Sequence, residues 1–109
     1  MKRQQTFCYA VAVLGASALT VAIAAEQTIH QKGRVFSADT VAVKKGDKVV
    51  FLNDDTVPHN IMSTSKGNEF NLGSVAPGTS IPVAFDNSGT VAVICAIHPR
   101  MKMTVTVSD

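Results

Sequence analysis

The chain has 109 residues, with ten Lys and Arg side chains against eight Asp and Glu. Lys2 and Arg3 lie at the extreme N-terminus, so residues 26–109 carry eight positive and eight negative side chains. This balance argues against nucleic acid or an anionic membrane as a partner, because both attract strongly basic proteins. The length predicts one small domain.

The N-terminal segment is typical of a secretory signal peptide. Lys2 and Arg3 precede an apolar or small-residue run over residues 7–24, and the alanine-rich residues 22–25 offer a cleavage site. An uncleaved membrane anchor is the alternative, because the run approaches the length that spans a bilayer. We expect residues 1–25 to be a signal peptide that is removed. Residues 26–109 would then form a periplasmic domain without stable membrane association.

The rest of the chain consists of short alternating or β-branched runs separated by Gly, Pro, Asn and Asp. The predicted strands, in chain order, are residues 28–36 (interrupted near Gly33), 40–44, 48–53, 61–64, 81–85, 90–95 and 101–107. Residues 65–78 predict an irregular excursion rather than a long helix, because they contain Gly67, Asn68, Gly73, Pro77 and Gly78. About seven short strands fit an all-β, antiparallel two-sheet sandwich.

The last turn of the predicted sheet carries three metal-binding residue types close together. Cys95, His98 and Met101 lie within seven residues, and His59 lies 36 positions before Cys95. Two imidazoles, one thiolate and a weak axial thioether are the ligands of a mononuclear copper site. Cys95 is the only cysteine of residues 26–109. A lone exported cysteine is unusual, and although it could be a small buried hydrophobe, its neighbours favour a metal ligand.

Strand parity predicts where these side chains point. Alternate residues of a strand lie on the same face, so Cys95 shares a face with Val91 and Val93. Met101 likewise shares a face with Val105. If the valines face the core, Cys95 and Met101 point inward at the ends of adjacent strands.

Two motifs together resemble the blue-copper cupredoxins, most closely the amicyanin and plastocyanin group. They are Pro58-His59-Asn60 and Cys95-x-x-His98-Pro99-x-Met101. The segments 43–47 and 88–90 extend the resemblance over nearly all of residues 26–109. It implies a Greek-key β-sandwich that binds one copper ion and shuttles single electrons. We expect a monomer that meets redox protein partners transiently.

Carried over by residue, the resemblance makes His59, Cys95 and His98 the equatorial copper ligands. It makes Asn60 the residue that joins the two ligand loops by hydrogen bonds. Two spacings are possible for the axial ligand: Met101 is three residues after His98, and Met103 is five after. The valine pattern of the last strand favours Met101, and Met103 remains the alternative.

The ligand set leaves more than one function open. The leading interpretation is an electron carrier, and the alternative is a periplasmic copper-binding protein for copper tolerance or delivery. An enzyme is disfavoured, because a filled type 1 site has no open position for substrate.

Several residues near the motifs carry further expectations. His30 is expected to be an exposed strand residue, and Asp54 and Asp55 a solvated turn. Ile97 stands where many relatives have Pro, so its N–H is expected to donate a second hydrogen bond to the Cys95 sulfur.

The residues around the second histidine suggest a surface for partners. Val57, Pro58, Ile97 and Pro99 are expected to form an apolar collar around His98. Such a collar could dock a redox partner, or it could simply seal the metal from water. Transient redox contacts are small, so a modest patch would suffice.

Overall fold

The computed structural model describes residues 25–109, so the expected signal peptide lies almost entirely outside the described residues. Within residues 25–109 there is no helix long and apolar enough to cross a membrane. The described residues form nine strands, which are β1 (Glu26–Lys32), β2 (Val35–Phe36), β3 (Thr40–Lys44), β4 (Lys48–Asn53), β5 (His59–Ser63), β6 (Phe70–Val75), β7 (Ser80–Ala84), β8 (Gly89–Ile94) and β9 (Lys102–Ser108).

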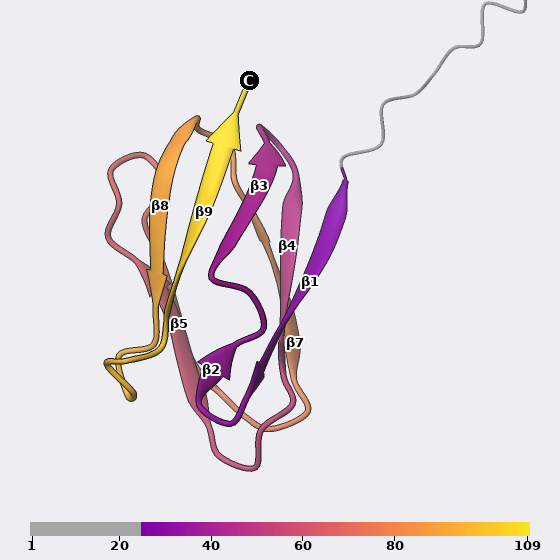
Figure 1. The fold of residues 1–109 in the computed structure, drawn as a ribbon, viewed down its shortest axis with the longest axis vertical. Coiled ribbons are helices and arrows are strands. Elements are labelled where there is room, and N and C mark those ends of the chain that lie inside the picture. The colour runs from indigo at the N-terminus through magenta and orange to yellow at the C-terminus, as the bar shows by residue number, and fades with distance from the viewer. Residues whose placement is uncertain (1–24) are drawn as a thin grey trace, which may run out of the picture.

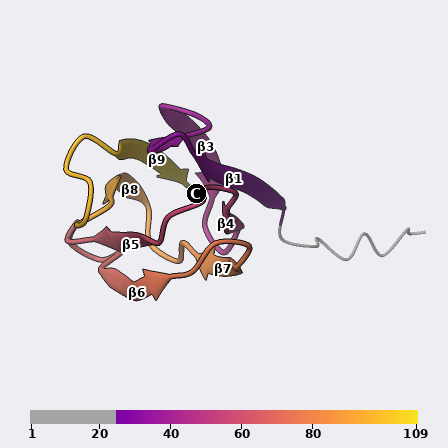
Figure 2. The same cartoon turned by 90° about the horizontal axis from the view of Figure 1, so that it is seen from below.

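The strands form two sheets that make up a sandwich, as the end-on view in Figure 2 shows. One sheet has the order β2-β1-β4-β7 and the other β3-β9-β8-β5-β6. The predicted all-β sandwich is confirmed. The prediction of about seven strands, all antiparallel, is wrong in detail: there are nine in the described residues, and β1–β4 and β3–β9 pair in parallel. Parallel neighbours arise here because the chain visits the other sheet between them.

Strand β6 was not predicted from the sequence. It pairs antiparallel with β5, and the register shifts between Asn60 and Met62. Its sequence is a poor strand former, because Gly73 and Asn71 have low β propensity. As an edge strand it buries only Val75 fully, with Phe70 and Leu72 packed against the core. The alternation of buried and exposed residues along β6 is therefore weak, which explains why the sequence did not predict this strand.

The core consists of the inward-facing side chains of both sheets. Val91, Val93 and Cys95 are all buried, which confirms the predicted parity of the eighth strand and its extension. Met101 and Val105 are also buried, together with Met103 and Val107 between and beyond them. Cys95 and Met101 therefore continue two rows of core residues to one end of the sandwich.

One end of the sandwich gathers three loops that are distant in sequence. Figure 1 shows the loop from β8 to β9, the loop from β4 to β5 and the turn from β1 to β2 at the lower end, with the C-terminus at the upper end. The β8–β9 loop is closed by two backbone hydrogen bonds: Cys95 N–H to Met101 O at 3.1 Å and Met101 N–H to His98 O at 2.8 Å. This arrangement brings residue 59 beside residue 95.

The buried side chain of Gln31, in β1, destabilises the fold. Its side chain is fully buried, and neither polar atom has a hydrogen-bond partner within residues 25–109. We expect Gln31→Met to raise the free energy of unfolding by about 1 kcal/mol, because it keeps the volume and removes an unpaired buried amide. Urea unfolding of the copper-free protein measures this.

A matched control is Gln27→Met, because the exposed Gln27 side chain donates to the carbonyl of Ala42. That change should give no gain in the free energy of unfolding. A loss of stability in Gln31→Met would contradict the prediction, since it would show that the buried amide is satisfied in solution.

Candidate metal centre

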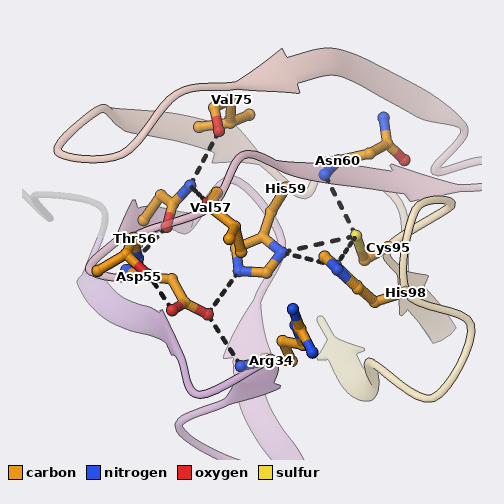
Figure 3. Close-up of polar contacts among 10 residues, drawn as sticks. Arg34, Asp55, Thr56, Val57, His59, Asn60, Val75, Cys95 and His98 are labelled. Atoms are coloured by element: carbon orange, nitrogen blue, oxygen red, sulfur yellow. Dashed lines mark hydrogen bonds and ion pairs between the residues drawn. The ribbon is translucent and has the colours of Figure 1, made fainter.

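Three donor atoms from two segments distant in sequence converge at the loop end of the sandwich (Figure 3). His59 begins β5, Cys95 follows β8, and His98 lies in the β8–β9 loop. The Nδ1 atoms of the two histidines are 3.1 Å apart. The Cys95 Sγ lies 3.9 Å from Nδ1 of His59 and 3.8 Å from Nδ1 of His98. His59 and Cys95 are buried and His98 is half-buried.

These separations fit one shared metal ion. Metal–nitrogen bonds of about 2.0 Å and metal–sulfur bonds of about 2.3 Å at angles of about 100–120° place neighbouring donors roughly 3–4 Å apart. The three donor pairs all lie in this range. A soft thiolate with two imidazoles suits copper in both oxidation states. The structure thus brings together three of the four predicted ligands around a single point.

The two candidate axial methionines lie at different depths. Both are buried. Met101 precedes β9 and closes the ligand loop through its backbone hydrogen bonds to Cys95 and His98. Met103 lies within β9 opposite Val93, one same-face position further from the loop. The position of Met101 thus places it in the ligand loop itself, whereas Met103 belongs to the core row.

Asn60 joins the two ligand loops in the predicted way. Its backbone N–H donates to the Cys95 sulfur at 3.2 Å, and its side-chain oxygen accepts from the Ala96 N–H at 3.1 Å. Its amide also donates to Asn71 Oδ1 at 2.8 Å and to Gly73 O at 3.0 Å. Among residues 25–109, the expected second hydrogen bond from the Ile97 N–H to the sulfur is not formed.

The prediction of a solvated turn is wrong for Asp55. Its Oδ2 accepts from Nε2 of His59 at 2.9 Å, and its side chain is only 13% exposed. Asp54 does lie at the surface, where it contacts the exposed His30. No sequence signal pointed to Asp55, because its role depends on a loop that curls back over the ring of His59.

The surroundings of Asp55 keep its carboxylate ionised. The backbone N–H of Arg34, the His59 ring and the Thr56 N–H together lower the pKa of Asp55 to about 2. A carboxyl with a depressed pKa stabilises the fold above its unfolded pKa, which is about 4. That contribution is lost as the pH falls from about 4 through the folded pKa of about 2.

The second histidine also reaches the surface. His98 lines an open hollow together with Arg34, Ile97, Pro99 and Arg100. Ile97 is 49% exposed, which makes it one of two exposed large hydrophobic side chains in the described residues. The expected apolar collar thus exists at Ile97 and Pro99, and two arginines stand beside it.

Together, the sandwich and its buried thiolate–imidazole cluster define the class of mononuclear copper-binding β-sandwich proteins. Residues 23–108 match the family of copper-binding proteins described as the plastocyanin/azurin family. The chain belongs to this family, which confirms the resemblance found in the motifs. The ligand candidates and the family agree on one copper ion as the cofactor.

Individual relatives agree with this assignment. A plastocyanin from Scenedesmus fuscus is 33% identical over 86 residues, covering 67% of this chain and 86% of the plastocyanin. The structure of a purple cupredoxin from Nitrosopumilus maritimus has a TM-score of 0.67 and 26% identity, covering 75% of this chain and 99% of that one. A reduced amicyanin variant has a TM-score of 0.71 at 23% identity, covering 82% and 87%. The last likeness establishes the fold alone.

Proposed function

We propose that this protein is a periplasmic single-electron carrier with one type 1 copper held by His59, Cys95, His98 and, axially, Met101. The observation that carries the proposal is the cluster of two imidazoles and one thiolate with all donor atoms within 4.8 Å of one another. The membership of the plastocyanin/azurin family supports it.

Each residue of the site has a distinct part in electron transfer. Copper, when bound, supplies a one-electron Cu(II)/Cu(I) couple. The Cys95 thiolate and the Met101 thioether suit the reduced ion, and the imidazoles suit both states. Asn60 holds the Cys95 sulfur from the neighbouring loop. Because these contacts are buried and mutually bonded, the protein has little to rearrange when an electron enters or leaves.

The filled ligand set argues against an enzyme. Catalytic metal sites keep one position free for substrate or water, and four side chains would leave none here. A copper-containing nitrite reductase from Thermus scotoductus SA-01 has the same fold, with a TM-score of 0.71 and 22% identity. This chain covers only 22% of that protein, so the likeness concerns the fold of that part alone.

Substitution of each methionine tests the axial assignment. We expect Met101→Leu to change the visible spectrum and to raise the reduction potential, because Cu(I) accepts a site with only three donors more readily than Cu(II) does. A tenfold change in relative affinity corresponds to about 59 mV for one electron. Met103→Leu is the matched control and should leave the spectrum unchanged. The reverse pattern would make Met103 the axial ligand.

We further propose that the hollow beside His98 docks an acidic redox protein. Arg34 and Arg100 are the only arginines of residues 25–109, and both line this hollow. The residues from 26 onward have no net charge, so attraction to a partner must come from such a local patch. Exposed Ile97 supplies an apolar centre, and arginine is the cation favoured at protein interfaces.

The charge of this face can be measured with a small anionic oxidant. We expect Arg100→Glu to slow oxidation of the reduced protein by hexacyanoferrate(III) about tenfold at low ionic strength. The effect should shrink in high salt, where charges are screened over a few ångströms. Lys66→Glu, in the loop at the far end of β5, is the control with the same charge change. Equal slowing in both variants would show that electrons do not leave through this face.

An optical redox titration of the copper-loaded protein tests the carrier function. A reversible one-electron couple with intense thiolate-to-copper absorption supports it. Rapid loss of copper to a mild chelator, with or without that couple, would instead indicate a protein for copper tolerance or delivery.

Mass spectrometry of the protein isolated from the periplasm tests the proposed location, which predicts a chain shortened by its first 25 residues.

A further inference from the structure

We infer that Asp55 is a positioning residue of the copper site, which orients the His59 ring and lowers the reduction potential through its negative charge. This inference rests on copper ligation by His59, which is part of the proposed function. It does not depend on the protein being an electron carrier.

The geometry decides which nitrogen of His59 is free for a metal. The ring is fully buried, and each of its nitrogens faces a different partner (Figure 3). Nε2 is 2.9 Å from Oδ2 of Asp55, and Nδ1 faces the donor atoms of Cys95 and His98. An ionised carboxylate can only accept a hydrogen bond, so Nε2 must carry the proton. Nδ1 is then left with its lone pair directed at the metal position.

The Asp55 carboxylate is itself held from several sides. Its Oδ2 also accepts from the backbone N–H of Arg34 at 2.9 Å, and its Oδ1 accepts from the N–H of Thr56 at 2.9 Å. The N–H of Asp55 donates to Oδ1 of Asn53, whose amide donates to the carbonyls of Val57 and Val75. The carboxylate therefore cannot turn away from His59 without breaking its hydrogen bonds to the N–H groups of Arg34 and Thr56.

The Arg34 N–H comes from an unusual turn. Gly33 and Arg34 have φ angles of 63° and 58°, and Lys32 pairs with Val35, which together make a two-residue hairpin with both central residues left-handed. Among residues 25–109, Arg34 is the only residue other than glycine with a positive φ angle. Such a conformation is uncommon for an arginine and persists where surrounding contacts hold it. Here the turn between β1 and β2 directs the Arg34 N–H to the Asp55 carboxylate that orients His59.

The charge of Asp55 acts on the two copper states unequally. A carboxylate hydrogen-bonded to a ligating imidazole raises the basicity of that ligand. The more highly charged Cu(II) gains more from this than Cu(I), in a buried setting where screening is weak. Asp55 therefore stabilises the oxidised protein relative to the reduced one.

The test compares Asp55→Asn with Asp54→Asn, which removes the same charge one residue away. Asp54 contacts exposed His30 and not a ligand. Affinities for Cu(II) and Cu(I) are measured by competition with chelators for each variant. We expect Asp55→Asn to lower the ratio of Cu(II) to Cu(I) affinity about tenfold, which is a rise of about 59 mV in potential. Asp54→Asn should change the ratio less than twofold.

A second measurement needs neither a variant nor copper. Nitrogen-15 NMR of the metal-free wild-type protein reports which nitrogen of His59 carries the proton, and Nε2–H is expected. A proton on Nδ1, or equal affinity ratios in the two variants, would overturn the role of Asp55. If both measurements succeed while the redox titration shows no reversible couple, only the electron-carrier proposal fails.

Discussion

Cys95→Ser is expected to abolish the intense visible absorption of the copper-loaded protein. That absorption requires a thiolate, and Cys95 is the only cysteine of the described residues. The copper affinity should fall more than about 100-fold, because losing a direct ligand exceeds the 10–100-fold cost of losing a residue behind one. Absorption spectra and competition with a Cu(I) chelator measure the two effects.

The neighbouring change Ala96→Ser is the control for Cys95→Ser. It adds the same hydroxyl group one position along, at an exposed residue whose backbone N–H binds Asn60. Its spectrum and affinity should match the wild type. Strong visible absorption surviving in Cys95→Ser would contradict ligation by this thiolate.

Asn60→Ala is expected to lower the free energy of unfolding by about 2–4 kcal/mol. It removes a buried amide that bonds to three residues in two segments, and it leaves the Ala96 N–H and the Gly73 carbonyl without that partner. Each of the three lost hydrogen bonds contributes about 0.5–1.5 kcal/mol. Urea unfolding of the copper-free protein measures this.

Asn68→Ala serves as the control for Asn60→Ala. Asn68 makes an amide hydrogen bond to the Asn87 carbonyl in an exposed loop. Its loss should cost less than about 1 kcal/mol, because water can replace an exposed hydrogen bond. Equal losses in the two variants would show that Asn60 does not link the ligand loops in solution.

Much of the site could be predicted because its residues lie in two short motifs. The loop from Cys95 to His98 carries two candidate ligands three residues apart. The alternation of faces along the strands correctly predicted that Cys95 and Met101 point inward. The strands at residues 40–44 and 48–53 were predicted with their observed bounds, since they alternate cleanly between buried and exposed positions. Local patterns sufficed wherever one face of a strand meets the core.

The unpredicted parts depend on contacts between segments distant in sequence. From the sequence, Asp54 and Asp55 are two equivalent acidic residues of a surface turn. Only the path of the loop in the structure directs Asp55 to His59 and Asp54 to the exposed His30. Arg34 and Arg100 are far apart in the chain, so no motif could place both beside His98. The parallel pairing of β1 with β4 likewise follows from the order in which the chain crosses between sheets. Local periodicity contains none of this information.

The central claim is that His59, Cys95 and His98 bind one copper ion in a site that exchanges single electrons. The most direct test is an absorption spectrum of the copper-loaded protein recorded during a redox titration. We predict intense thiolate-to-copper absorption at one copper per chain, which disappears and returns with a single reversible electron. Copper bound without that absorption, or absorption that does not respond to reduction, would contradict the claim.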